Sequence, residues 1–308
     1  MAGEPASKTL RLGLVHAPVT PFGADRAVDF DLFGNLLDFH RQNGADALAL
    51  PMHAGESVSL TEDEKRELIA FAVKHAQLPV VAHVSNAGTA IAAALAREAE
   101  TAGAAAIVAT TPYYWTPPPA MVLEHFAQIG AAVKIPLFVH NAPDDMAGSK
   151  VTAELMVKLI GRLDNCAGLI DSSLDWQFMI ELMTLARRAR PDFQLVAGTE
   201  LMVSAAAIGA TGMLSSLAAI APQLVRQLYD ASRAGKLFEA RAAQEEIATL
   251  QQAMKPVGAP ALKAALCAMG RDCGDPRPPL TTLDKDAAKT LAEKLGAMPA
   301  LAAEPRGW

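Results

Sequence analysis

The sequence repeats one pattern eight times: a short apolar run followed by a longer amphipathic segment. The runs have the length of buried strands, and the segments after them have the spacing of helices that cover a sheet. The pairs are 10–17 with 30–43, 47–51 with 62–76, 79–84 with 87–102, 105–110 with 120–133, 136–140 with 151–161, 166–170 with 174–189, 193–197 with 201–208, and 212–215 with 222–234. Eight consecutive βα units favour an α/β fold of the closed (β/α)8 TIM barrel type over an open doubly wound sheet.

After Gly235 the alternation stops and only helical segments follow. We therefore expect a (β/α)8 barrel over residues 1–235 and a C-terminal helical extension, packed on the barrel, over residues 236–308. The tail from Met298 looks frayed. Thr61 and Glu64 have the spacing of a capping box, which predicts the start of the second helix. Gly103 is expected to end the third helix.

Charge and hydropathy exclude several classes of protein. The net charge is −6, and the lysines and arginines are scattered, so no nucleic-acid partner is expected. Residues 1–11 lack the apolar run of a signal peptide. Residues 201–225 carry no charge, but Gly209, Gly212 and Pro222 divide them into helix, turn, strand and loop, so no membrane span is expected.

Cysteine usage points to a reducing compartment. Cys166, Cys267 and Cys273 are an odd number and have no metal-type spacing. We therefore expect free thiols and a cytoplasmic location. No cofactor and no metal site are predicted.

The active site of a TIM barrel lies where strands end and βα loops begin. The residues at those eight positions are His16, His53, His83, 110–114, His140–Asn141, Ile170–Asp171, Thr199–Glu200 and Ser215–Ser216. Four of the seven histidines are among them, whereas His40, His75 and His125 fall within helices. A cluster of histidines at one end of the barrel favours a functional pocket there.

Motifs in a fixed order resemble the dihydrodipicolinate synthase and N-acetylneuraminate lyase family. They are Ala17-Pro18-Val19-Thr20-Pro21-Phe22, Gly55-Glu56-Ser57 with residues 60–64, Pro112-Tyr113-Tyr114, Asn141-Ala142-Pro143, Gly209-Ala210-Thr211-Gly212 and Arg277-Pro278-Pro279-Leu280. The resemblance covers residues 12–295. It implies a TIM barrel, lyase chemistry on a small-molecule substrate, and a homotetramer or homodimer in which the tyrosine of the fourth loop reaches a neighbouring subunit. Glu56 is expected to be a buried residue that holds its loop.

The chain lacks the lysine on which that family's chemistry depends. Family members are class I aldolases, in which a lysine at the end of strand six forms a Schiff base with a 2-oxo acid. The matching segment here reads Gly168-Leu169-Ile170-Asp171-Ser172-Ser173, and isoleucine has no nucleophile. Lys255 and Lys263 lie on the C-terminal helices, where we expect them to be solvated and unable to substitute.

Other departures from the family's pattern cluster around the same end of the barrel. The resemblance places His140 and His53 where the family has a tyrosine and a threonine of its proton relay, and His83 where it has glycine. Tyr114 is retained. Imidazoles are good acids and bases near neutral pH. We therefore predict His53, His140 and Tyr114 as catalytic residues. The predicted substrate-binding residues are Ala54, His83, Tyr113, Ile170, Asp171, Glu200 and Ser215.

These residues favour a lyase of aldolase or hydratase type, acting on a small oxo acid or related carbonyl compound by His/Tyr acid–base catalysis without a Schiff base. Two alternatives stay open. One is a non-catalytic pseudoenzyme that binds a small molecule. The other is a metal-dependent lyase or hydrolase that uses His53, His83 and His140 with a carboxylate of Asp171 or Glu200. Trp115, Met121 and Met146 suggest a pocket that admits something bulkier than pyruvate.

Overall fold

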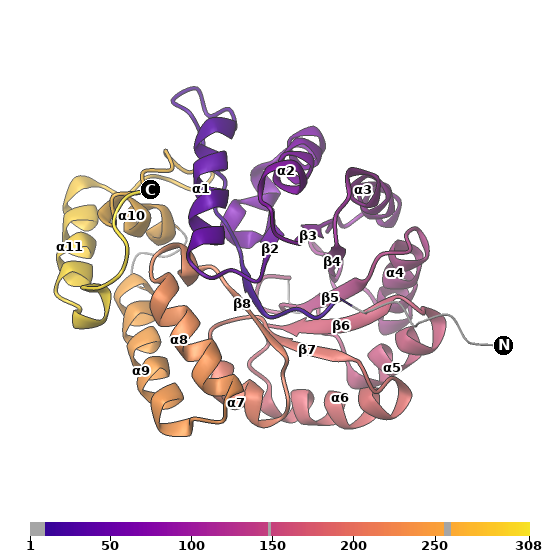
Figure 1. Cartoon of the computed structure of the whole chain (residues 1–308). Coiled ribbons are helices and arrows are strands. Elements are labelled where there is room, and N and C mark those ends of the chain that lie inside the picture. Colours follow the sequence, from indigo (N-terminus) through magenta and orange to yellow (C-terminus); the bar gives the residue numbers. More distant parts are fainter. Residues whose placement is uncertain (1–9, 147–148, 256–259) are drawn as a thin grey trace.

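The computed structural model describes residues 10–146, 149–255 and 260–308. Its eight parallel strands close into a barrel in which each strand pairs with the next and β8 pairs with β1 (Figure 1). The strands are β1 (Leu14–His16), β2 (Ala47–Leu50), β3 (Val80–His83), β4 (Ala106–Thr110), β5 (Leu137–Asn141), β6 (Cys166–Asp171), β7 (Gln194–Ala197) and β8 (Gly212–Ser215). The predicted fold class is therefore confirmed.

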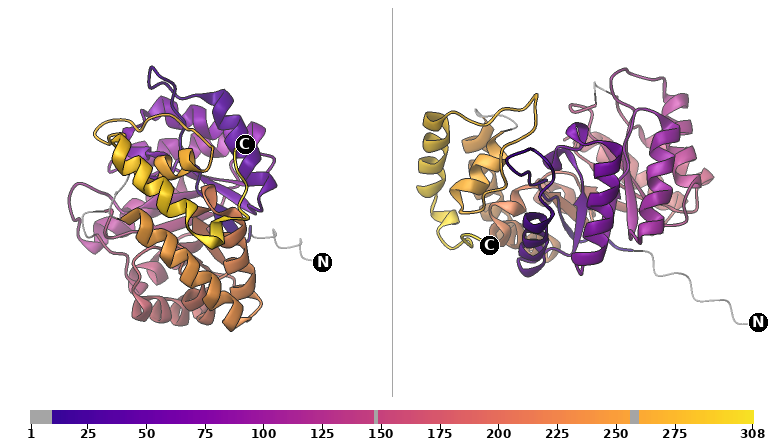
Figure 2. Two further views of the ribbon diagram at one scale, coloured as in Figure 1. Left: turned by 90° about the vertical axis from the view of Figure 1, so that its left-hand side faces the viewer. Right: turned by 90° about the horizontal axis from the view of Figure 1, so that it is seen from above.

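One helix follows each strand, and these helices surround the barrel (Figure 1). They are α1 (Phe30–Gln42), α2 (Glu62–His75), α3 (Thr89–Ala102), α4 (Pro119–Ala131), α5 (Ala153–Arg162), α6 (Trp176–Ala189), α7 (Met202–Ala207) and α8 (Pro222–Arg233). Three further helices, α9 (Leu237–Met254), α10 (Ala261–Ala268) and α11 (Lys285–Gly296), gather on one side next to α8 and α1, as Figures 1 and 2 show. The boundary predicted between residues 235 and 236 coincides with the end of the βα alternation and stays a prediction as a domain boundary.

Two apolar cores follow from the alternation of side chains along each strand. One fills the barrel and includes Val15, Val81, Phe138 and Ile170. The other lies between the strands and the helices and contains the alternate strand residues, such as Leu14, whose side chains point outward. We say that two strand residues have the same parity when their side chains point to the same side of the barrel wall. Each strand-end side chain must therefore point either into the barrel or into the helix layer.

Local signals in the sequence fix several helix ends as expected. The Thr61 side chain accepts from the Glu64 amide and Glu64 accepts from the Thr61 amide, so the capping box is confirmed. Gly103 ends α3 in the left-handed region, with φ of 97°. Residues 201–225 form α7, β8, the short 3-10 turn η3 (Leu217–Ala219) and the start of α8. Across the three described ranges, no helix is long and apolar enough to cross a membrane.

The C-terminal tail is packed, so the expectation of a frayed end is wrong. Leu301, in the turn η5 (Pro299–Leu301), is fully buried. The buried Arg271 guanidinium donates to the carbonyl oxygens of Pro305 and Ile220. The carboxylate of Glu304 accepts hydrogen bonds from the first amides of α8. These hydrogen bonds and the burial of Leu301 hold the tail against α8 and α10, because the polar groups on both sides are satisfied.

His16 does not belong with the histidines of the barrel mouth, contrary to expectation. It has the same parity as Leu14, so its ring points outward and is completely buried between β1 and α1. There the Nδ1 atoms of His16 and His40 lie 3.0 Å apart. Burial, with a smaller contribution from the charge of Arg226, lowers the pKa of His16 to about 3. This pair is part of the packing of α1 on the barrel.

The lowered pKa of His16 predicts acid lability. The unfolded chain has the ordinary histidine pKa of about 6.5, so it takes up a proton below that pH while the folded protein does not. Stability is therefore lost as the pH falls from 6.5 toward 3, and this one residue accounts for a loss of about 2 kcal/mol between pH 7 and pH 5. Urea unfolding at both pH values should show a smaller loss for His16→Asn than for the wild type. His75→Asn, on the exposed side of α2, should lose as much as the wild type; equal losses in all three proteins would contradict the prediction.

Candidate active site

A cavity of about 640 Å³ opens where the βα loops meet the C-terminal helices. Among the predicted site residues, His53, Ala54, His140 and Glu200 line it. Its wall also contains side chains of α9, α10 and the segment around Pro279. The cavity lies at the carboxyl ends of the strands, where TIM barrels hold their active sites, and its volume is typical of a small-molecule site.

The apolar part of this wall comes from residues other than the expected ones. Val19, Met254 and Leu262 line the cavity. Trp115, Met121 and Met146 do not line it, and Trp115 and Met121 are exposed. The suggestion of a roomy, apolar pocket is supported by the volume and by these other residues.

His53 and Ala54 lie on η1 (His53–Gly55), a single turn directly after β2. Gly55 is packed so closely that a Cβ atom there would lie 3.2 Å from both Pro18 O and Thr20 Oγ1. The Thr20 hydroxyl donates to Gly55 O at 2.6 Å. These contacts with the segment after β1 fix the turn, while the His53 ring is exposed at the cavity.

His140 ends β5 and points into the barrel, because Phe138, two residues earlier, packs in the barrel interior. Its Nε2 atom lies 3.0 Å from Ser172 Oγ, and its buried Nδ1 atom has no hydrogen-bond partner among the described residues. Burial, with a smaller contribution from the charge of His53, lowers the pKa of His140 to about 4. The ring is therefore neutral at pH 7.

His83 ends β3 and has the parity of Val81, which also packs in the barrel interior. It is buried and does not line the cavity. Burial, followed by the charges of His140 and Lys65, lowers the pKa of His83 to about 3. Inward-facing imidazoles thus stand on β3 and β5, on either side of β4, and both are neutral at pH 7.

Ile170 is completely buried in the barrel interior. It lies in register with His140 on one neighbouring strand and with Val196 on the other. It does not line the cavity. The position at which the family resemblance places the lysine is thus occupied by an apolar side chain, as the sequence indicates.

Tyr113 and Tyr114 do not line the cavity of their own chain. Tyr113 is half-buried, and burial raises the pKa of its hydroxyl. Tyr114 is 94% exposed and has a φ of 84°, in the left-handed region that a non-glycine residue rarely adopts. Within one chain, Tyr114 is therefore not placed to contact a ligand of the cavity.

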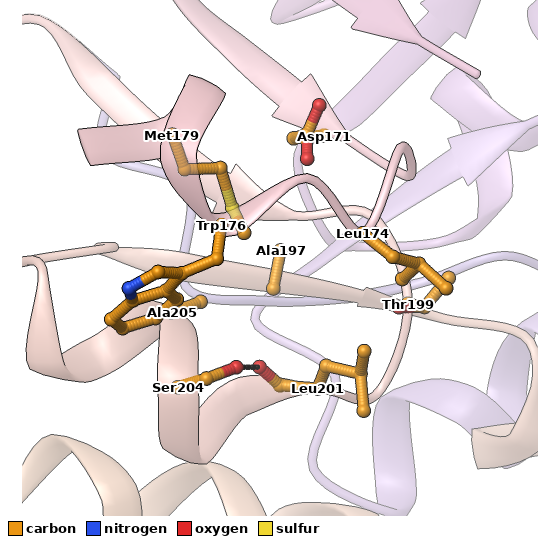
Figure 3. A pocket seen from close by; sticks show the side chains of 9 residues that line it. All are labelled: Asp171, Leu174, Trp176, Met179, Ala197, Thr199, Leu201, Ser204 and Ala205. Atoms are coloured by element: carbon orange, nitrogen blue, oxygen red, sulfur yellow. Dashed lines mark hydrogen bonds between the residues drawn. The ribbon is translucent and has the colours of Figure 1, made fainter. Parts of the chain in front are cut away.

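Asp171 has the opposite parity to Ile170 and points outward from the barrel. Asn141 Nδ2 and Ser173 Oγ donate to its two carboxylate oxygens at 2.7 and 2.9 Å. Burial raises the pKa of Asp171, and these two hydrogen bonds oppose that shift. Asp171 borders a separate pocket of about 310 Å³ between α6 and α7, where Figure 3 shows the side chains of Leu174, Trp176 and Leu201. Thr199 borders both this side pocket and the main cavity.

Glu200 is buried at the cavity wall, and both of its carboxylate oxygens are hydrogen-bonded. Ser215 Oγ donates to Oε1 at 2.7 Å, and Gln251 Nε2, from α9, donates to Oε2 at 3.0 Å. Ser215 itself is fully buried and does not line the cavity. These contacts give Glu200 and Ser215 a role in joining the end of β8 to α9.

Lys263 is the clearest feature of the site that sequence reasoning missed. It lines the cavity, is buried, and forms an ion pair with the buried Glu56 at 2.9 Å, so the expectation of a solvated side chain is wrong. Its Nζ also lies 3.3 Å from Asp275 O and 4.1 Å from the centre of the Phe22 ring. Burial lowers its pKa, and Glu56 opposes that shift. The buried, loop-holding role expected of Glu56 is confirmed.

Ser172 and Lys255 also line the cavity and were not predicted as site residues. Ser172 follows Ile170 by two positions, so strand parity alone would have placed it on the inner side. Lys255 ends α9 at the cavity wall. No short-range pattern connects α9 with the βα loops, so nothing in the sequence pointed to Lys255.

The metal-dependent alternative receives no support from the arrangement of the side chains. In the parts of the chain that the structure describes, no three His, Cys, Asp or Glu side chains are grouped so that they could hold a metal ion. His53 is exposed, while His83 and His140 are buried and pair with protein groups instead.

Comparisons with known proteins agree with the barrel and its motifs. The model of the dihydrodipicolinate synthetase family matches residues 11–298. A 4-hydroxy-tetrahydrodipicolinate synthase of Chlorobaculum parvum is 33% identical over 300 residues, covering 94% of this chain and 99% of that protein. The crystal structure of dihydrodipicolinate synthase from Aquifex aeolicus has a TM-score of 0.88 at 27% identity, covering 95% of this chain and all of that one. KD(P)GA from T. tenax has a TM-score of 0.82 at 26% identity, covering 92% and 97%.

The match to the family model covers residues 11–298. These residues include all eight strands of the barrel and the C-terminal helices α9, α10 and α11. The chain belongs to the dihydrodipicolinate synthetase family.

Proposed function

We propose that this chain is a lyase that acts on a small carbonyl compound, such as an oxo acid, by acid–base catalysis without a lysine imine. The observation that carries the proposal is the pairing of Ile170, buried in the barrel interior, with two histidines, His53 and His140, that line the cavity beside it. Relatives named as synthases and aldolase-like structures support carbon–carbon bond chemistry at this end of the barrel.

The two histidines are suited to different tasks. His53 is exposed, so the imidazolium formed when it accepts a proton stays hydrated; it is the candidate base for a proton on the carbon next to the carbonyl. His140 is neutral and buried, and among the described residues no carboxylate is placed to balance a positive charge on its ring. A neutral imidazole acts instead as a hydrogen-bond donor, and we assign it to the stabilisation of the oxyanion that develops as the proton leaves, through the hydroxyl that its ring contacts.

Lys263 does not replace the missing lysine in this proposal. An imine requires an amine with a free electron pair. The Lys263 ammonium contacts Glu56, Asp275 O and the Phe22 ring, and the ion pair with Glu56 occupies it in place of a substrate, although burial lowers its pKa. Lys255, which lines the wall without an ion pair among the described residues, supplies a positive charge for the carboxylate of an acid substrate.

We also propose that the protein assembles as a homodimer or a dimer of dimers. Several regions of the described surface expose large apolar side chains, which is uncommon on a monomer, and two of these regions lie at βα loops. One includes Tyr114, Trp115 and Met121, and the other, around the side pocket in Figure 3, includes Leu174, Trp176 and Leu201. A dimer of dimers requires two separate self-complementary surfaces. In such an assembly Tyr114 would contact the site of a neighbouring subunit, its proposed catalytic role.

The absence of an imine is tested by incubation with pyruvate and borohydride, which converts any imine into a stable secondary amine. Intact-mass spectrometry should show no specific adduct on the wild type, because position 170 carries no amine and Lys263 is engaged in its ion pair with Glu56. Ile170→Lys should form an adduct at position 170. An adduct on the wild type that disappears in Lys263→Met would identify Lys263 as the amine and return the chain to the Schiff-base enzymes.

The role of His53 is tested by the exchange of the methyl protons of pyruvate in deuterium oxide, followed by proton NMR. His53→Gln should slow exchange by about 100-fold, since a general base contributes at least that much. His75→Asn, on an outer helix, should exchange at the wild-type rate. Pyruvate that binds to the wild type without exchange would instead support the pseudoenzyme.

Light scattering at micromolar concentration should show a dimer or a tetramer for the wild type. If the protein is a tetramer, Trp176→Asp should leave dimers, because it places a charge in only one of the two apolar regions. Tyr114→Asp should disrupt the contact made by the other region. A wild-type monomer would contradict the proposed assembly.

A further inference from the structure

Ser172 presents the only polar contact of the His140 ring among the described residues. The Nε2 atom of His140 lies 3.0 Å from Ser172 Oγ, whereas its Nδ1 atom is buried without a partner. Ser172 is half-buried and lines the cavity. His140 and Ser172 both line the cavity, so the hydroxyl of Ser172 lies beside the ring, where a ligand in the cavity can reach it.

The surroundings of the ring favour one tautomer. A buried N–H without an acceptor is rarer in proteins than a buried acceptor without a donor. The proton of the neutral ring therefore belongs on Nε2, where it donates to Ser172 Oγ, and Nδ1 keeps its electron pair. In that arrangement the oxygen of Ser172 is an acceptor toward His140, and its own O–H remains available to donate to a ligand.

The backbone around Ser172 holds this hydroxyl in place. The Ser172 amide donates to Asn141 O on β5 at 2.8 Å, and the Gly198 amide donates to Asp171 O at 2.7 Å. Gly198, at the end of β7, leaves the space that the hydroxyl occupies, because a Cβ atom there would collide with Ser172 Oγ. The strands on both sides thus position the short side chain of Ser172 beside His140.

We propose that Ser172 is a catalytic residue that donates a hydrogen bond to the carbonyl oxygen of the substrate, and that His140 is a positioning residue that acts through it. This inference rests on the proposed lyase function. As a base such as His53 removes a proton from the carbon next to the carbonyl, the electron pair moves toward the carbonyl oxygen, and the Ser172 O–H stabilises the charge that develops there. The N–H of His140 strengthens this donor, since hydrogen bonds in a chain polarise one another. No proton has to reside on His140.

The donor role is tested with the exchange of pyruvate protons in deuterium oxide. Ser172→Ala should lower kcat for exchange by about 100-fold with little change in KM, the loss expected for one oxyanion donor. Ser172→Thr, which keeps the hydroxyl, should recover most of the rate. The neighbouring Ser173→Ala, which leaves the contact with His140 intact, should exchange close to the wild-type rate. Exchange by Ser172→Ala at the wild-type rate overturns the proposal.

Two variants of His140 and a pH profile distinguish a positioning residue from a general base. The amide of His140→Gln can still donate to Ser172, whereas His140→Leu cannot, so the glutamine variant should exchange clearly faster than the leucine variant. A neutral donor also predicts that the pH profile of exchange shows no step from His140 above pH 5, because its pKa is about 4. Equal losses in both variants, together with such a step, overturn the proposal.

NMR of 15N-labelled histidine decides the pairing without a substrate. The wild type should show His140 neutral at pH 7 with its proton on Nε2, and Ser172→Ala should shift the Nε2 signal while Ser173→Ala leaves it unchanged. A proton on Nδ1 in an exchange-active wild type overturns this inference alone. If the proton is on Nε2 but the wild type does not exchange pyruvate protons, the pairing of His140 with Ser172 is supported and the proposed function is overturned.

Discussion

A closed barrel allows the side chain at the end of each strand only two directions. It points into the barrel or into the layer of helices, and the next residue along the strand takes the other direction. Here that parity sends His83, Thr110 and His140, on three consecutive strands, to the inside. The same rule sends His16 and Asp171 outward, where His16 meets α1 and Asp171 borders the pocket between α6 and α7. The composition of the candidate site follows from this constraint before any specific contact is considered.

Burial then determines what the inward-facing imidazoles can do. Because the charged form of a buried histidine loses its hydration, the pKa values of His83 and His140 fall well below 6.5. Both rings are neutral at physiological pH, and within the part of the chain that the structure describes no carboxylate contributes to the pKa of either ring. His53 differs from them because its ring is exposed at the cavity. A set of histidines that looks equivalent in the sequence therefore divides into two buried rings and one exposed ring.

The fold could be predicted from the sequence because its signals are local and repeated. Each βα unit carries its own apolar run, and features such as the Thr61–Glu64 capping box mark the boundaries. The direction of the side chains in the first strand could not be predicted in this way, because residues 14–17 include apolar side chains that point inward and outward. The prediction that His16 faces the barrel mouth was wrong for this reason. Ser172 could have been found by counting two residues from Ile170. The exposure of Tyr114 and the packing of the tail depend on contacts that no local pattern encodes.

Contacts between distant parts of the chain give the cavity its final shape. Lys263 of α10 reaches Glu56 after β2, Gln251 of α9 reaches Glu200 after β7, and Arg277 binds the carboxylate of Glu64. The hydrogen bond from Arg277 holds the pKa of Glu64 at about 2, so this tether persists across the physiological pH range. Breaking a buried ion pair such as that of Lys263 costs several kcal/mol, because one charge is left without a partner.

The C-terminal helices are therefore more than an addition to a finished barrel. They secure the loop that carries His53 through Glu56, and they supply Met254, Lys255 and Leu262 to the cavity wall. In the family resemblance a single lysine on β6 is the reactive group, and loss of that lysine would leave such a barrel with only a binding pocket. In this chain Ile170 is buried by apolar packing in the barrel interior, while the polar groups that face the cavity come from the end of β5, from the loops after β2, β5, β6, β7 and β8, and from α9 and α10. The polar side chains of the cavity are therefore supplied by its loops and C-terminal helices and not by position 170.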